Sequence, residues 1–263
     1  PTENLRAWDL YLRARAAQAE YSAEGQKEAI LLAGLAIRQD PLFAGPHALR
    51  ARARGLMFFN QWLDETEANL EEAIADARTA VRLQPNSPAA YAALGYVYRL
   101  TGDATQSIAN LTRARELNPN DANIRLELAH TLDWFRQQDL ALPEIREALR
   151  LSPRDPRLQV MLFYKAHILF HLGQYQDSLA AADEMSGAIS SDFWRVFYHL
   201  VRAANLAHLG REEDAQMAID RARTVNPNLS LSQIKRRFEG SNNHPENRRA
   251  WLEALEQAGL PET

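Results

Sequence analysis

The chain has 263 residues, of which 46 % are hydrophobic and 24 % are charged, and its formal net charge at pH 7 is −4. This is the composition of an ordinary folded protein, and the small net charge gives no overall attraction to nucleic acid or to an anionic membrane. The absence of cysteine excludes disulfides, thiolate chemistry and cysteine-ligated zinc. No apolar run approaches the ~20 residues that span a bilayer. We therefore expect a cytoplasmic protein without a membrane or nucleic-acid partner.

A pair of amphipathic helices is predicted at the start of the chain. Residues 4–20 place one set of apolar side chains on a single helical face, namely Leu5, Trp8, Leu12, Ala16 and Ala19. A partner helix spans 26–38 and ends at Asp40-Pro41, because proline cannot continue the helical hydrogen bonding.

The second pair, residues 42–86, departs from a plain helical hairpin in two ways. Its inter-helix connection, near residues 59–67, is about ten residues longer than in an ideal hairpin of this repeat. Its first helix carries Arg50, Arg52 and Arg54. In one interpretation these arginines lie over apolar surface or pair with neighbouring acids, and in the other they meet an anionic group of a partner. The first interpretation is favoured, because isolated surface charges seldom mark sites.

Residues 88–121 show the hairpin most clearly. Gly102-Asp103 supplies a turn between two amphipathic segments, and Asn118-Pro119 ends the second segment. The apolar positions follow helical spacing in both segments: Tyr91, Leu94, Gly95 and Tyr98, then Ile108, Leu111, Ala114 and Leu117. One such hairpin cannot bury its own apolar stripes, so copies of it are expected to stack.

The pattern recurs along the chain. The terminating proline returns after 34 residues from Pro85 to Pro119 and again to Pro153. Small residues recur where two helices cross: Gly95, Ala129, Ala166 and Ala203 in the first helices, and Ala73, Ser107, Ala141, Ser178 and Ala215 in the second. Over about nine-tenths of the chain this resembles the tetratricopeptide repeat (TPR) family. The resemblance implies an all-α, right-handed superhelix, a solenoid of about six helical hairpins with C-terminal capping helices.

The expected boundaries follow from the repeat. The array spans residues 1–229, with hairpins at about 4–41, 42–86, 88–121, 122–155, 156–190 and 192–227, and capping helices occupy 230–263. In the fourth hairpin Arg136-Gln137 replaces the usual turn glycine, and the first helix of the fifth looks extended by roughly one turn. The cap is expected to be a helix from Ser230 or Ser232 to Gly240 and a last helix ending at Gly259. Trp251, Leu252 and Leu255 should seal the exposed end of the stack.

The opening ENLRAWDLYLRAR has a character of its own. It resembles the block that begins the TPR region of bacterial class III adenylate/guanylate cyclase proteins and winged-helix regulators, and it matches at Asn4, Ala7, Asp9, Leu10, Tyr11, Leu12 and Arg13. The ending AGLPE resembles the end of the same proteins. This implies the C-terminal regulatory or sensory region of a bacterial signalling protein, with a free-standing assembly scaffold as another possibility. Because the sequence begins at Pro1 without Met, we expect it to be a fragment, and because the AGLPE ending lies so near Thr263, we expect a natural C-terminus.

Motifs for chemistry are few. The sequence has no phosphate-binding glycine loop, no nucleophile elbow and no H-E-x-x-H. His167 and His171 share a helix face and, with His130, could hold a metal. No carboxylate or cysteine completes that set, so we expect imidazoles that line a groove. We expect no cofactor, no metal and no catalysis by this chain.

In TPR arrays the first helices of successive hairpins line the concave face. The resemblance therefore places there Tyr96, Arg99, His130, Trp134, Phe163, His167, Phe170 and His171. Aromatic side chains with Arg and His suit recognition of a protein or peptide, but large residues can also simply fill a tight superhelix. We expect a peptide or a helix along units three to five, with Tyr96, Trp134 and Phe163 as anchors. Unperturbed imidazoles would make affinity depend on pH between about 5 and 8.

Overall fold

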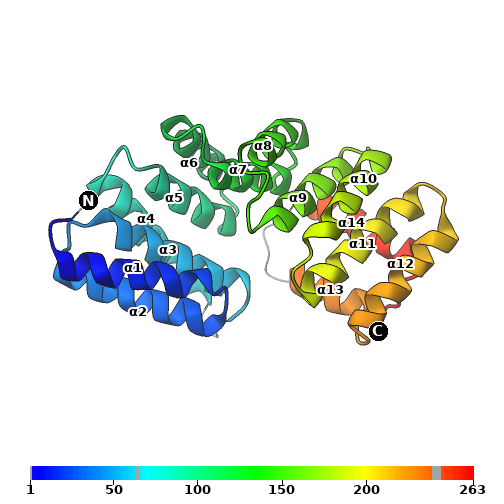
Figure 1. The fold of residues 1–263 in the computed structure, drawn as a ribbon, viewed down its shortest axis with the longest axis horizontal. Coiled ribbons are helices and arrows are strands. Elements are labelled where there is room, and N and C mark those ends of the chain that lie inside the picture. Colours follow the sequence, from blue (N-terminus) through cyan, green and yellow to red (C-terminus); the bar gives the residue numbers. More distant parts are fainter. Residues whose placement is uncertain (1, 63–65, 239–243) are drawn as a thin grey trace. The chain divides into compact units, whose positions relative to one another are not determined.

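The computed structural model describes residues 2–62, 66–238 and 244–263, and these residues form fourteen α-helices and one short 3-10 helix without any β-strand (Figure 1). The predicted all-α fold is thus confirmed. The chain divides into two compact units, Pro1–Asn120 and Asp121–Thr263.

Three helical hairpins build the first unit. Its helices are α1 (Leu5–Ala19), α2 (Ala23–Gln39), α3 (Ala44–Phe59), α4 (Thr66–Leu83), α5 (Pro88–Leu100) and α6 (Ala104–Leu117). Each odd-numbered helix packs against the even-numbered helix that follows it. The hairpin α5–α6 shows why the sequence folds locally: the Ser87 and Asp103 side chains cap the two helix starts, and Gly102 takes a positive φ of 81° in the turn.

The second unit adds three more hairpins and two terminal helices. Its helices are α7 (Ala122–Trp134), α8 (Gln138–Leu151), α9 (Leu158–His171), α10 (Tyr175–Met185), the 3-10 helix η1 (Ser186–Ala188), α11 (Asp192–His208), α12 (Glu212–Val225), α13 (Leu231–Phe238) and α14 (Pro245–Gln257). The first helices of these hairpins are neighbours, because α9 contacts both α7 and α11. We call the surface that α7, α9 and α11 share the inner face of the second unit.

Small residues let paired helices approach closely. A Cβ atom added to Gly95 of α5 would lie 2.7 Å from Leu111 Cγ and 2.9 Å from the Ser107 carbonyl oxygen of α6. Across the same contact the Ser107 hydroxyl donates to the Gly95 carbonyl at 2.7 Å, and Ser178 bonds Ala166 identically in the hairpin α9–α10. The recurring small residues therefore mark helix crossings, as the repeat pattern predicted.

Replacing Gly95 by alanine should destabilise the first unit by about 1–3 kcal/mol, since the new methyl group overlaps backbone atoms that cannot rotate away. Denaturant unfolding measures this loss. Gly187 is the control: a Cβ there meets nothing within 4 Å, so Gly187→Ala should leave stability nearly unchanged. Equal stability of the two variants would contradict the close crossing.

Three local expectations need correction. The predicted apolar face of α1 does not enter the core: Leu5 is 82 %, Trp8 41 % and Leu12 43 % exposed. The buried face carries Ala7, Ala14 and Ala17. Small residues are needed there because α2 lies close to α1: a Cβ added to Gly25 of α2 would be 2.6 Å from the Ala17 carbonyl oxygen.

The helix α9 is also not extended. It has 14 residues, against 13 in α5 and α7, because Asp155 accepts the Arg157 backbone N–H and holds a turn before Leu158. In the second hairpin, α3 and α4 have 16 and 18 residues against 13 and 14 in α5 and α6. The helices, more than the connection, therefore absorb the extra length.

The arginines of α3 surround a buried acid. Arg50 donates to Asp76 of α4 at 2.7 and 2.5 Å, Arg54 pairs with the same carboxylate, and His47 lies 3.4 Å from it. Burial would raise the pKa of Asp76, but the hydrogen bonds from His47 and Arg50 and the arginine charges together hold it below its usual range. The interpretation that Arg50 and Arg54 pair with neighbouring acids is confirmed.

Candidate functional site

The eight predicted groove residues divide between the two units. Tyr96 and Arg99 belong to the first unit and are almost fully buried, at 3 % and 2 % exposure. The guanidinium carbons of Arg99 and of Arg52 each lie 5.0 Å from the centre of the Tyr96 ring. Such cation–π contacts are expected to fix the Tyr96 side chain in place.

The other six residues form one connected cluster on the inner face of the second unit. His130 packs edge-on to Trp134 with ring centres 5.5 Å apart, and Phe163 contacts His167 at 4.3 Å. His167 and Phe170 each contact His171, at 5.7 and 5.6 Å. Tyr164 joins the two halves, because its ring lies 4.0 Å from His130 and 5.4 Å from Phe163. The structure thus brings these six side chains together, mostly buried.

An acid that sequence reasoning missed holds this cluster. Asp133 of α7 is buried, and its carboxylate lies 2.7 Å from the His171 Nδ1 atom. The Gln138 amide also donates to this carboxylate, at 3.3 Å. A buried carboxylate needs such partners, because leaving it without them costs several kcal/mol.

The last helix of the chain lies on this cluster. The ring of Trp251 in α14 is 4.4 Å from His167 and 5.4 Å from Phe170. The Asn247 amide donates to the Asp133 carbonyl oxygen at 2.7 Å and accepts from Gln138 at 3.2 Å. In Figure 1 the red helix α14 appears among α9, α10 and α11, and it packs on α11. Trp251 was expected at the exposed end of the stack, but its ring packs on α9, which belongs to the hairpin before the last one.

Two further contacts complete the attachment of α14. The His244 backbone N–H donates to the Trp134 carbonyl oxygen at 3.1 Å, and Glu246 forms an ion pair with Arg136. Besides its packing on α11 and α13, this segment contacts six residues of α7, α8, α9 and the turn after α7, which we call the α14-binding surface: Asp133, Trp134, Arg136, Gln138, His167 and Phe170. Three of these, Trp134, His167 and Phe170, were predicted as groove residues.

The C-terminal end of α7 explains why α14 begins beside it. The last carbonyl groups of a helix lack intrahelical partners, and the Asp133 and Trp134 carbonyls receive donors from Asn247 and His244. The start of α14 also carries a partial positive charge that complements the end of α7. Arg136, with a φ of 61°, adopts the conformation that Gly102, Gly173 and Gly210 hold in three other turns.

The end of the chain is part of the same assembly. The Leu231 and Ser232 backbone N–H groups at the start of α13 donate to the Pro261 and Glu262 carbonyl oxygens, at 2.8 and 3.0 Å. Ser230, one of two predicted capping residues, accepts the Gln233 N–H. The predicted end of this helix at Gly240 lies outside the described residues.

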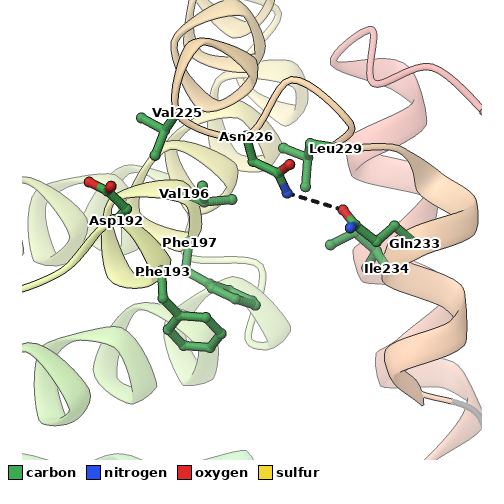
Figure 2. A pocket seen from close by; sticks show the side chains of 9 residues that line it. All are labelled: Asp192, Phe193, Val196, Phe197, Val225, Asn226, Leu229, Gln233 and Ile234. Atoms are coloured by element: carbon green, nitrogen blue, oxygen red, sulfur yellow. Dashed lines mark hydrogen bonds between the residues drawn. The ribbon is translucent and has the colours of Figure 1, made fainter.

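A pocket opens beside this cluster, between α11, the end of α12 and α13. Figure 2 shows Phe193 and Phe197 of α11 on one side and Ile234 of α13 on the other. The Asn226 amide donates to Gln233 at 3.2 Å and bridges the two sides. The cavity measures about 340 Å³. Phe193, 45 % exposed, contacts Phe197 at 4.8 Å. Since Phe197 in turn contacts Phe163 at 5.5 Å, the aromatic cluster reaches solvent here.

His167 departs from the pH behaviour expected of it. Burial, aided by the neighbouring His171 and opposed by Asp133, lowers the pKa of His167 to about 3. In the folded chain this imidazole is therefore neutral between pH 5 and 8. The expected change of affinity in that interval cannot come from His167.

The same pKa predicts acid sensitivity of the fold. The unfolded chain takes up a proton on His167 near pH 6.5, whereas the folded chain does so near pH 3. The contribution of neutral His167 to the free energy of unfolding is therefore fully present above about pH 6.5. Below that pH the free energy of unfolding falls by about 1.4 kcal/mol per pH unit. Denaturant unfolding at pH 7, 6 and 5 should show this loss, and His167→Phe should reduce the slope by one proton.

His199 and His208, whose pKa values burial also lowers, add their own share to the slope. Met161→Leu, a change of a buried neutral residue on the same helix, is the control and should shift stability equally at every pH. A slope unchanged in His167→Phe would contradict the assignment.

Among the described residues, no group of three or more His, Asp or Glu side chains is arranged so that it could hold a metal ion. His171 contacts Asp133, while His130 stacks near Tyr164. In the ranges described, none of the helices has the length and apolar character needed to cross a membrane.

Comparison with known protein families finds a match at one hairpin, α5–α6. Residues 88–121 match the family model described as tetratricopeptide repeat. Over 101 residues the chain is 35 % identical to cellulose synthase operon protein C of Escherichia coli (strain K12). This stretch is 38 % of the present chain and 8 % of that protein. The chain therefore matches only a small part of this much longer relative.

Solved structures share the fold at low sequence identity. Pseudomonas aeruginosa pilF matches with a TM-score of 0.64 and 15 % identity, covering 90 % of this chain and 100 % of that one. A thermophilic TPR protein of Thermus thermophilus matches with a TM-score of 0.60 and 19 % identity, covering 73 % and 98 %. YrrB, a TPR protein with an unusual peptide-binding site, matches with a TM-score of 0.52 and 19 % identity, covering 79 % and 95 %. The chain has the helical fold of TPR proteins.

Proposed function

We propose that this TPR chain is a protein-interaction module that binds a segment of a partner protein on the inner face of its second unit. One observation carries the proposal: this face already accepts a helix, because α14 packs on it through Trp251 and Asn247. The peptide-binding site named for the similar YrrB structure supports the same kind of ligand. The module itself is proposed to be non-catalytic.

The proposed contact residues are the eight predicted from the sequence, with different tasks. Trp134, Phe163 and Phe170 are buried and form the floor of the site. Phe193 and the pocket beside it offer the accessible apolar surface that a partner meets first. Tyr96 and Arg99 belong to the first unit and stay in the proposal as partner contacts of that unit.

The test is capture of partners from a lysate of the source organism by the immobilised full chain. Trp134→Ala, His167→Ala and Phe193→Ala should each lower recovery of a specific partner, and Trp134→Ala should cost more than ~2 kcal/mol of binding. Circular dichroism must first show that each variant keeps its helices. Leu31→Ala is the matched control, because Leu31 is an apolar residue of the first unit that is 60 % exposed. Equal recovery by all variants would mean that these residues only fill the helix array.

The parent protein is the finer part of the proposal. The block at residues 4–13 supports the C-terminal regulatory region of a bacterial signalling protein such as a class III adenylate or guanylate cyclase. A winged-helix transcriptional regulator and a free-standing scaffold are the alternatives. The gene upstream of Pro1 decides between them: a cyclase domain supports the first, a winged helix the second, and a short independent reading frame the third.

A further inference from the structure

We propose that the α14-binding surface is a receptor for one class of amphipathic helix, and that α14 is its intramolecular occupant. The helix it recognises carries Glu, then Asn at the next position, Trp four positions later and Leu four positions beyond, as α14 does with Glu246, Asn247, Trp251 and Leu255. A partner helix of this pattern takes the place of α14. The inference rests on the proposed function and specifies its ligand.

The apolar half of the pattern comes from Trp251 and Leu255. They are four residues apart and so share one helix face, and both are almost completely buried, at 2 % and 0 % exposure. Trp251 contacts the rings of His167 and Phe170. The His167 Nε2 atom is buried without a hydrogen-bond partner among the described residues. The rings of His167 and Phe170 nevertheless make this side of the receptor suited to a large aromatic side chain, which packs on both of them.

The polar half fixes the register of the helix. The Asn247 amide donates to the Asp133 carbonyl at 2.7 Å and accepts from Gln138 at 3.2 Å. A side-chain amide supplies a donor and an acceptor together, whereas a carboxylate would place its charge against the carbonyl oxygen and an apolar residue would leave both groups unsatisfied. Asn247 is buried, so a wrong residue here carries the full desolvation cost.

Arg136 favours an acidic residue in the bound helix at the position before the asparagine, which is Glu246 in α14. Arg136 occupies a turn position where the third, fifth and sixth hairpins have glycine, at a φ that costs a non-glycine residue about 1 kcal/mol. Its side chain pairs with Glu246 at the start of α14. Asp133 and Trp134 through their carbonyl groups, and Arg136 and Gln138 through their side chains, thus bond the incoming helix at this corner.

A free peptide competes poorly with a helix of the same chain, because a short tether gives the attached helix an effective concentration on the order of millimolar. The experiment therefore weakens α14 in the full chain by Asn247→Ala together with Trp251→Ala. The probe is a fluorescein-labelled synthetic peptide with the sequence of residues 244–258, followed by fluorescence anisotropy. It should bind this variant at least tenfold more tightly than the unaltered chain. The same peptide with alanine in place of Trp251 should lose at least tenfold.

A charge exchange tests the register in a chain whose core is untouched. Arg136 and Glu246 are both about half exposed, so Arg136→Glu should leave the fold intact. This chain should prefer a peptide carrying Glu246→Arg over the unaltered peptide by threefold or more.

Equal affinity of the peptide for the unaltered and weakened chains would place its binding elsewhere and overturn the proposal. Absence of peptide binding to a weakened chain that stays helical would also overturn it. If the weakened chain unfolds, the charge exchange decides, and absence of preference there overturns it. The proposed function is judged separately by partner capture. A partner lost on Phe193→Ala with no helix peptide bound would leave that function standing and refute this ligand class.

Discussion

Replacing Asp76 by alanine is expected to lower the free energy of unfolding of the first unit by about 3–5 kcal/mol, the usual cost of breaking a buried ion pair by removing one partner. The loss arises because Arg50, Arg54 and His47 all converge on this carboxylate. Without it, two guanidinium groups of α3 remain close together at the contact with α4.

Hydrogen exchange measured by mass spectrometry identifies the affected unit, since protection should fall in α3 and α4. Glu72→Ala is the control, because Glu72 pairs with Arg54 but its side chain is 61 % exposed, and it should cost less than ~1 kcal/mol. The lowered pKa of Asp76 also predicts how this stabilisation depends on pH. It is fully present above the pKa of about 3.9 that Asp76 has in the unfolded chain, and it is lost as the pH falls through the lower pKa of the folded chain. Similar losses for the two variants would refute the role of Asp76.

The second large effect is expected from Trp251→Ala, which should cost about 3–5 kcal/mol, as for other buried aromatic side chains. The substitution removes the ring from His167 and Phe170 and leaves a cavity under α14. Exchange protection should fall first in α14 and then in α9.

Trp8→Ala is the matched control for Trp251→Ala. The Trp8 ring is also in contact with other rings, those of Tyr11 and Phe43, but 41 % of the residue is exposed, so its loss should cost less than half as much. A cost for Trp251→Ala below that of Trp8→Ala would show that α14 adds little to the second unit.

The repeat pattern predicts those features of the fold, such as helix ends and turns, that depend on residues close together in sequence. Spacing and turn residues lie within one hairpin, so the apolar spacing together with Gly102 and Pro119 predicted α5 and α6. The face of α1 was less predictable, because both Leu5 and Ala7 satisfy helical spacing and only the close approach of α2 selects alanine. Periodicity states which residues share a face, but the packing distance decides which face is buried.

The candidate site was predictable only in part for a different reason. Trp134, His167 and Phe170 could be found because they recur at first-helix positions of successive hairpins. Their contact with α14 could not, since Gln138 and Asn247 are 109 residues apart in sequence and no short-range pattern connects them. The available signal was only Arg136-Gln137 in place of the turn glycine, and it is a weak one, because Tyr21 and Gln61 take a similar φ in the turns of the first two hairpins.

The distance between Gln138 and Asn247 also sets an order of events during synthesis. The hairpins of the first unit can close as soon as each second helix is made. The rings of His167 and Phe170 in α9, however, can be covered only after Trp251 has been synthesised. At about 5–20 residues per second, the 109 residues from Gln138 to Asn247 take roughly 5–20 s to translate. During that interval the nascent chain displays His167 and Phe170 uncovered, and it is then most open to chaperones and to association with other chains.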